Sequence, residues 1–345
     1  MFRQDRANPG TRVSQWRGRH DTAKGWSGSR VSTWLNGGLF AGGIVDGAYW
    51  VGGLNSLRAV IKTLFASDST STLAATLGSN TYGFAGCGDG MVAGYSAGND
   101  VGVSPWGTNV MDKQTFADES NVTLGSVLPQ LRWLLAAAGN AGNDGYFAGG
   151  QYQNGAATLM DTLFKVDFSD DSMSTSAETL TQGIMGMGSL ANNGVAAYWT
   201  GGTTGAEVDT IDKTDFSDDS TANIVDTLSD SVVYVTGFAN SGTAGYTGSG
   251  HDGSVGLDFV DKITFSDDGV AALAATITTR WSVASAGQKG EHGYFAGGYQ
   301  SPDSPTGYVD TMEKLDFSDD SIGAAGSTLP AASGAKADFA CDSGL

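Results

Sequence analysis

Lysine has the most regular spacing of any potentially reactive residue in the chain. Six of the nine lysines stand three residues before a phenylalanine, and the residue two positions before each of these lysines is apolar. A ring of ammonium groups could bind an anionic ligand. Residues two apart share one face of a strand, however, and a lysine on a buried face needs an acidic partner. We therefore expect each of these side chains to pair with an acidic side chain of its own or of the adjacent structural unit. They are Lys62, Lys113, Lys165, Lys213, Lys262 and Lys314.

An acidic turn follows each of the six phenylalanines. It reads SDDS at 169–172, 217–220 and 318–321, SDDG at 266–269, and ASDS or ADES in two altered copies. Clustered carboxylates can bind Ca²⁺ through their oxygens. Asp and Ser side chains can also accept hydrogen bonds from the backbone amides of a turn. The turns lack the alternating Asp spacing of calcium-binding loops, which favours the second interpretation.

Other residues with catalytic or metal-binding potential are scarce. The histidines, His20, His251 and His292, fall in the N-terminal segment and in two different repeats. No P-loop or zinc-ligand spacing is present. The two cysteines, Cys87 and Cys341, lie among small residues and are predicted to be buried. We therefore expect no catalytic residue, no metal site and no cofactor, and hence a protein that is not an enzyme.

The chain as a whole is a tandem repeat. Aligning the six phenylalanines gives intervals of 51, 52, 48, 49 and 52 residues. A tyrosine before each phenylalanine begins a short aromatic strand that usually ends in Gly-Gly. Each unit divides into four short strands, a to d, separated by Gly, Asn and Asp clusters typical of turns. Four strands in a unit of about 50 residues indicate an all-β fold, a β-propeller with one blade per unit.

The Gly-Gly doublet that closes strand b and the strand c that follows it resemble the kelch repeat. The resemblance covers 29–345 and implies a kelch-like β-propeller. Units of the form YFAGG…VDTMEKLDFSDDS also resemble the repeat-rich virion structural proteins of marine tailed bacteriophages. This second resemblance implies a component of a phage particle.

The repeat pattern divides the chain into an N-terminal arm, 1–28, and a propeller, 29–345. The units run 39–80, 81–131, 132–182, 183–230, 231–279 and 280–331. The remaining segments, 29–35 and 336–341, are predicted to be terminal closing strands. Six units give six blades, or seven if the closing strands share a composite blade. We expect seven, because a shared blade would protect exposed strand edges and tie the termini together.

Charge differs sharply between these two parts. Residues 1–36 carry a net charge of +5, although the whole chain carries −19. An acidic body disfavours direct nucleic-acid binding. No signal peptide and no membrane-spanning run is recognisable, so we expect assembly in the host cytoplasm and no membrane insertion. The basic arm is predicted to anchor the protein to other virion proteins through Arg3, Arg6, Arg12, Arg17 and Arg19.

The loops between strands b and c vary most in length. From the marker tyrosine to the marker phenylalanine the distances are 16, 21, 22, 18, 19 and 23 residues. Variable loops on a rigid scaffold are a plausible binding surface, and aromatic residues are effective contacts there. Drift at unconstrained loop tips is the alternative. The predicted binding residues are Trp106, Tyr152, His251, Tyr299 and Tyr308.

These observations favour a non-enzymatic virion protein, located in the phage particle. Its propeller would be displayed on the tail, a fibre or the capsid, and could recognise a host-surface glycan or protein. An intracellular kelch-type interaction scaffold is the first alternative, and a carbohydrate-active propeller enzyme is the second. The dipeptides Arg132-Trp133 and Arg280-Trp281 occupy equivalent repeat positions, so we assign them to packing.

Overall fold

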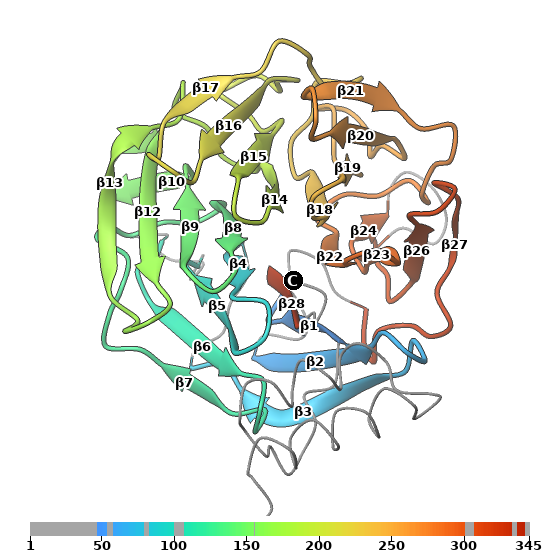
Figure 1. Ribbon diagram of the computed structural model, residues 1–345, viewed down its shortest axis with the longest axis horizontal. Helices are drawn as coiled ribbons and strands as arrows, with labels where there is room; N and C mark the ends of the chain where they lie inside the picture. The colour runs from blue at the N-terminus through green and yellow to red at the C-terminus, as the bar shows by residue number, and fades with distance from the viewer. Residues whose placement is uncertain are drawn as a thin grey trace, which may run out of the picture. The chain divides into compact units, whose positions relative to one another are not determined.

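The computed structural model describes residues 47–53, 58–78, 83–99, 107–154, 156–300 and 307–332, together with the backbone of 337–341. All regular structure in these residues is β-strand. Six four-stranded antiparallel sheets surround a central axis as the blades of a β-propeller, with strand a innermost and strand d outermost (Figure 1). The predicted all-β propeller is therefore confirmed.

The first three blades contain the following strands, in the order a to d. Blade 1 comprises β28 (Ala337–Cys341), β1 (Gly47–Val51), β2 (Ala59–Leu64) and β3 (Thr70–Thr76). Blade 2 comprises β4 (Ala85–Gly88), β5 (Ala93–Ala97), β6 (Met111–Thr115) and β7 (Asn121–Thr123). Blade 3 comprises β8 (Ala136–Asn140), β9 (Asp144–Ala148), β12 (Thr162–Asp167) and β13 (Met173–Thr179).

The last three blades repeat the same order. Blade 4 comprises β14 (Gly188–Asn192), β15 (Ala196–Thr200), β16 (Ile211–Asp215) and β17 (Thr221–Asn223). Blade 5 comprises β18 (Thr236–Asn240), β19 (Ala244–Gly248), β20 (Val260–Thr264) and β21 (Gly269–Ala272). Blade 6 comprises β22 (Ala284–Gln288), β23 (His292–Ala296), β26 (Met312–Asp316) and β27 (Ile322–Ala324).

The inner strands explain much of the glycine content. They converge on the axis, where neighbouring backbones approach too closely for a side chain. A Cβ atom on Gly139 of β8 would lie 2.2 Å from the Gly88 carbonyl oxygen, and one on Gly287 of β22 would lie 2.6 Å from that of Ala239. Small residues at these positions are therefore a steric requirement of six blades meeting at one axis.

The expectation of seven blades is wrong, because the structure has six. The C-terminal strand β28 pairs with β1 over five residues, from Gly47 opposite Cys341 to Val51 opposite Ala337. It therefore fills the innermost position of blade 1 and does not begin another blade. The other predicted closing strand, 29–35, lies outside the described residues. The ends of the described chain thus share a blade, as expected, but that blade is one of the six.

The propeller presents two different ends, which we name by their connections. The b–c face carries the b–c loops and the links from each strand d to the next strand a. The turn face carries the a–b and c–d turns. Two b–c loops contain an extra hairpin: β10 (Gln151–Asn154) with β11 (Ala156–Leu159) in blade 3, and β24 (Tyr299–Gln300) with β25 (Gly307–Tyr308) in blade 6. These are the loops of the two longest repeats.

Removing 336–345 should open the ring at blade 1. The deletion takes away β28, so β1 loses its inner partner strand and the blade loses its contacts with β22 and β4. We expect the free energy of unfolding to fall by on the order of 3–5 kcal/mol, because ladder hydrogen bonds and packing are lost together. Thermal and urea unfolding measure this. Deleting only 342–345 is the control, and an unchanged stability in the longer deletion would contradict closure by β28.

Candidate recognition site

The six repeated lysines pair with acidic residues of the next blade. The predicted acidic partners are therefore present, and the structure assigns them to the adjacent blade. In five blades the lysine Nζ and the hydroxyl of the marker tyrosine both bond one aspartate in the c–d turn of the following blade. Tyr95 Oη lies 2.6 Å from an Asp171 carboxylate oxygen, and Lys113 Nζ lies 2.7 Å from the same oxygen. The equivalent aspartates are Asp219, Asp268, Asp320 and Asp68. Glu119 takes this place in blade 2 and accepts from Lys62.

We call each such Tyr, Lys and acidic residue a lock. The acidic member has a positive φ in all six locks, between 52° and 61°. The tyrosine ring also stacks on the marker phenylalanine of the next blade, with centroid separations of 4.8–5.6 Å. The lysine Nζ lies 5.0–5.8 Å from the centroid of its own blade's tyrosine. Charge, hydrogen bonding and ring contact thus join every pair of neighbouring blades.

The remaining carboxylates of the acidic turns hold the turns themselves. Asp167 Oδ1 accepts from the Ser169 amide at 2.8 Å, and Asp170 Oδ1 accepts from the Ser172 amide at 2.9 Å. Blades 4 and 6 repeat both bonds. The prediction that these side chains bond turn amides is therefore confirmed for the described turns.

Electrostatics in the locks follow from this geometry. Burial alone would raise the pKa of the Asp68 carboxyl, but hydrogen bonds from Lys314, Tyr294 and the Gly326 amide hold this pKa below its usual value. Burial, together with the Asp171 carboxylate, raises the pKa of the Tyr95 hydroxyl. Tyr95 therefore remains a proton donor, and Asp68 remains charged at neutral pH.

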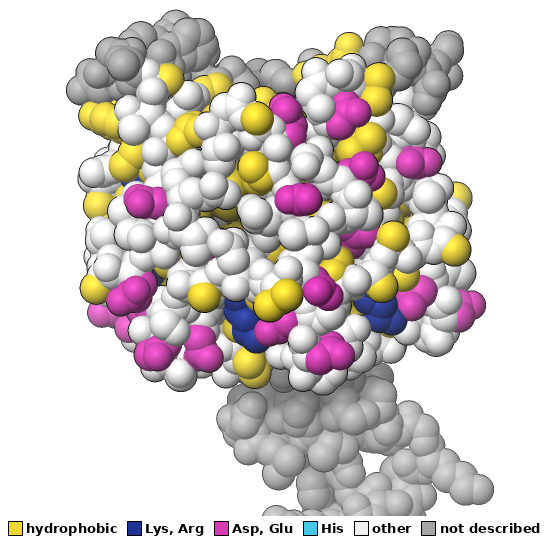
Figure 2. All heavy atoms as spheres, turned by 90° about the horizontal axis from the view of Figure 1, so that it is seen from above, with side chains coloured by type: hydrophobic (Ala, Val, Ile, Leu, Met, Phe, Trp, Pro, Cys, Tyr) yellow, Lys and Arg dark blue, Asp and Glu magenta, His cyan; other side chains and the backbone are white. Residues whose placement is uncertain are grey.

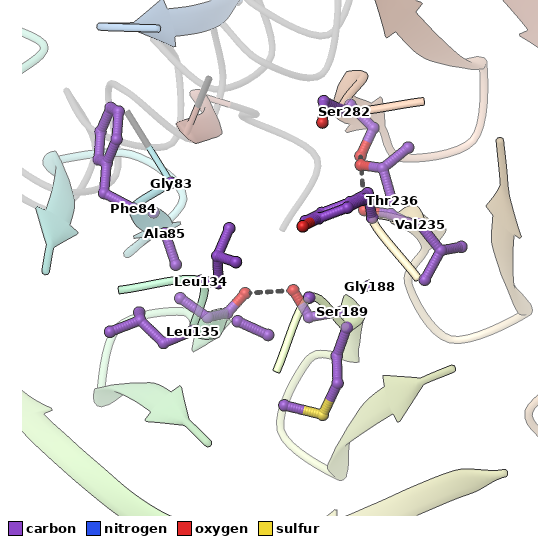
Figure 3. A pocket seen from close by; sticks show the side chains of 18 of the residues that line it. Gly83, Phe84, Ala85, Leu134, Leu135, Gly188, Ser189, Val235, Thr236 and Ser282 are labelled. Carbon is purple, nitrogen blue, oxygen red and sulfur yellow. Dashed lines mark hydrogen bonds between the residues drawn. The ribbon is translucent and has the colours of Figure 1, made fainter. Parts of the chain in front are cut away.

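A ring of backbone hydrogen bonds joins the links between blades at the mouth of the axial channel on the b–c face. Figure 3 shows this mouth, with Gly83, Leu134 and Ser282 among the residues that line it. The links between blades place one residue of positive φ there in each of five blades: Gly83, Leu134, Gly186, Tyr234 and Ser282. Each amide in this series after the first donates to the carbonyl of the preceding member, at 2.6–3.3 Å. The strained backbone of Leu134 and Tyr234 is thereby supported on both sides, and that of Ser282 is supported through its amide. The cavity at this mouth is narrow, about 140 Å³.

The same links position the residue just before each member of this ring. Trp281 forms two backbone hydrogen bonds with Tyr299, the first residue after a Gly-Gly doublet, at 3.1 and 2.8 Å. Val233 and His251 make the equivalent pair in blade 5, at 3.0 and 2.9 Å. The His251 loop also backs onto blade 6, because Gly250 donates to the Arg280 carbonyl. His251 is therefore brought beside Trp281.

Four rings form a continuous series on this part of the b–c face, which we call the aromatic row. The ring centroids of His251 and Trp281 lie 4.8 Å apart, those of Trp281 and Tyr299 lie 4.7 Å apart, and those of Tyr299 and Tyr308 lie 5.1 Å apart. All four side chains are partly exposed. The interplanar angles of 70° and 76° at the two ends of the row are edge-to-face arrangements that aromatic pairs prefer, and the central Trp281–Tyr299 pair is tilted at 47°.

A buried ion pair lies beneath the row. The Arg280 side chain is fully buried, and its guanidinium bonds both Glu313 of β26 and Thr311. Burial lowers the pKa of Arg280, and Glu313 opposes this shift. Arg280 therefore packs as predicted and fixes the link that carries Trp281.

Blade 3 has the same Arg-Trp dipeptide but a different arrangement. Arg132 is fully buried, and Phe164 stands where blade 6 has Glu313. The Phe164 and Tyr152 ring centroids lie 5.2 and 6.0 Å from the guanidinium carbon. Burial lowers the pKa of Arg132 to about 10. Tyr152 thus covers a buried cation, and it contacts Arg132 where Tyr299 contacts a tryptophan.

The structure brings together three of the five predicted binding residues: His251, Tyr299 and Tyr308. Tyr152 lies in another blade, and Trp106 lies outside the described residues, as do the predicted anchoring arginines of the arm. The analysis of the sequence missed Trp281, which was assigned to packing. One available signal was the coincidence of a tryptophan with the longest b–c loop.

Other features of the surface are less specific. Figure 2 shows an edge of the propeller, where acidic side chains far outnumber basic ones. Cys87 is buried, and burial raises the pKa of its thiol. Within the described ranges there is no group of three or more His, Cys, Asp or Glu side chains that could hold a metal ion. These ranges also contain no helix that could cross a membrane.

Comparison with models of known protein families finds no match, and comparison with curated proteins finds none either.

Replacing Asp68 with Asn should weaken the lock that closes blade 6 onto blade 1. Asn tolerates the positive φ but cannot pair with Lys314, so we expect a loss of about 1–3 kcal/mol at pH 7. Because the folded-state pKa of Asp68 is depressed, its stabilisation is present above the pKa of the unfolded chain. It is lost as the pH falls through the folded-state pKa, below about pH 4.

Urea unfolding at pH 7 and pH 3 measures both effects. The Asp68→Asn variant should lose less stability between these two pH values than the native protein does. The control is Asp258→Asn, which changes an exposed carboxylate of a b–c loop and should behave like the native protein. An equal acid-induced loss in the native protein and in Asp68→Asn would contradict the assignment.

Proposed function

We propose that this protein is a non-enzymatic recognition module of a phage particle, and that its b–c face binds a ligand on the host surface. The aromatic row is the observation that supports this proposal. Aromatic side chains provide large contact areas at small entropic cost, and they dominate binding energies where they cluster. The buried Arg280–Glu313 pair and the backbone bonds of Trp281 hold the row rigid before any ligand arrives.

The end of the propeller at which the chain enters also supports display of the aromatic row. Gly47, the first residue of β1, pairs with Leu64, which precedes a c–d turn, so the chain enters the described blades at the turn face. The aromatic row lies on the b–c face, at the other end of the strands. An anchor that precedes residue 47 would therefore connect to the end away from the row. The basic 1–28 segment suits such an anchor if its partner in the particle is acidic.

The assignment to a phage particle depends on the wording of the repeat, YFAGG…VDTMEKLDFSDDS, which resembles that of phage virion proteins. A kelch-like ancestry is consistent with the six four-stranded blades. The particle position that we favour is a tail, fibre or capsid decoration, in contact with other virion proteins through the arm.

Truncating Trp281 should abolish recognition without unfolding the protein. Trp281→Ala is expected to weaken binding of the labelled full-length protein to host cells by about 30-fold or more, corresponding to about 2 kcal/mol. Trp133→Ala is the matched control. Trp133 occupies the equivalent link position and forms the equivalent backbone pair with Gln151, but it lies outside the row. Equal cell binding by the folded Trp281→Ala variant and the native protein would refute recognition by the row.

Deleting 1–28 should separate anchoring from recognition. We expect the truncated protein to melt at the native temperature and to bind host cells normally, because the row and all six locks lie beyond residue 46. Its incorporation into particles should be lost, as measured by quantitative mass spectrometry of purified virions. A control variant reverses the charge of Arg12, Arg17 and Arg19 without shortening the chain. Full occupancy of particles by the truncated protein would show that the anchor lies elsewhere.

A further inference from the structure

We infer that the aromatic row is a platform for a neutral sugar unit, so that the ligand of the b–c face is an uncharged glycan. This inference rests on the proposed function and specifies the chemistry of its ligand. Three properties of the row lead to it: the way its rings pack together, the polar atoms at its edges, and the charge around it.

The rings form a surface and do not enclose a space. Neighbouring centroids lie 4.7–5.1 Å apart, which is direct ring contact, edge-to-face in two pairs and tilted in the third. An aromatic cage for a quaternary ammonium group needs rings separated by the width of the cation. A row of touching rings instead presents an extended apolar strip, broken by ring edges. The C–H face of a pyranose ring matches such a strip, because stacking removes apolar area from water on both sides.

Hydrogen-bonding groups stand at both ends of the strip. His251 Nδ1 accepts a bond from the Gly253 amide at 2.9 Å, so the neutral ring carries its proton on Nε2. The phenol groups of Tyr299 and Tyr308 lie at the opposite end, and each can both donate and accept. Burial and the neighbouring Tyr299 raise the pKa of Tyr308, which keeps it a donor. Sugar hydroxyls require this mixture of donors and acceptors beside an apolar face.

The surroundings of the row disfavour a negatively charged ligand. The segments 251–260, 278–282 and 299–311 contain one Lys or Arg residue, which is Arg280, and four aspartates. Arg280 is fully buried and already paired with Glu313, so it offers no charge to a ligand. Asp252 and Asp258 are exposed. In a chain of net charge −19, these exposed carboxylates disfavour an acidic sugar at this site.

The experiment follows the indole N–H signals of the full-length protein by NMR during titration with the methyl glycosides of glucose, galactose, mannose and N-acetylglucosamine. Methyl glucuronide and choline are the charged probes. Trp281→Phe assigns the Trp281 signal, and Trp133→Phe assigns the control signal. We expect saturable shifts of the Trp281 signal with at least one neutral glycoside. The Trp133 signal should not move, and the two charged probes should shift neither signal.

Two variants test the hydrogen-bonding role of His251 at its end of the aromatic row. His251→Ala should weaken binding of the neutral glycoside about tenfold, whereas His251→Gln should restore most of it, because its amide nitrogen can donate from the position of Nε2. Unchanged binding in the folded His251→Ala variant would remove His251 from the site. Shifts of Trp281 only with methyl glucuronide or with choline would overturn the neutral-glycan assignment.

The outcomes separate this inference from the proposed function. If host-cell binding requires Trp281 but no neutral glycoside shifts its signal, the glycan assignment is wrong and the recognition face stands, with a protein ligand as its replacement. If a neutral glycoside shifts the Trp281 signal but host-cell binding does not require Trp281, the sugar site is real and the proposed function is wrong.

Discussion

The lock between neighbouring blades is the interaction on which the rest of the structure depends. Each blade offers a tyrosine and a lysine that are cross-strand neighbours, such as Tyr146 and Lys165. The next blade offers a carboxylate on a residue of positive φ and a phenylalanine ring at the end of strand c. The residue that carries this carboxylate adopts the left-handed conformation, and the carboxylate thereby points toward the tyrosine and lysine of the preceding blade. The SDDS motif therefore forms a contact between blades as well as a turn within a blade.

Because the locks form a cycle, the last one must join blades that are distant in sequence. Tyr294 and Lys314 bond Asp68, more than 220 residues away. The C-terminal strand β28 reinforces the same junction from the inside, since it lies between β22 and β4 and pairs with β1. The ring is thus closed by side chains near the turn face and by a backbone ladder at the axis. Once it is closed, the loops of the b–c face can change without loss of the scaffold.

Features that recur in every repeat could be predicted from the sequence, whereas features that occur once could not. The Tyr, Lys and Phe markers recur six times, so the lysines of strand c could be assigned to acidic partners from the sequence, although not to partners in a particular blade. The closing strand occurs once. Residues 39–43 and 337–341 are both short runs of small and apolar residues, and pattern alone could not decide which pairs with β1. Trp281 was missed for a related reason, because its repeat equivalence with Trp133 indicated packing. Trp281 differs from Trp133 because its backbone partner is the aromatic Tyr299 and because the His251 loop lies beside it.

Blades 3 and 6 show how one scaffold supports two roles at equivalent positions. Both bury an arginine next to a tryptophan, but the first two hairpin residues are Gln-Tyr in blade 3 and Tyr-Gln in blade 6. Successive residues of a strand point to opposite sides. The tyrosine of blade 3 therefore covers Arg132, which has Phe164 in place of a carboxylate partner. In blade 6, Glu313 neutralises the arginine, so Tyr299 is released to extend the row beside Trp281. The residue at this position of strand c, Glu313 in blade 6 and Phe164 in blade 3, thus decides which hairpin can offer its aromatic ring to a ligand.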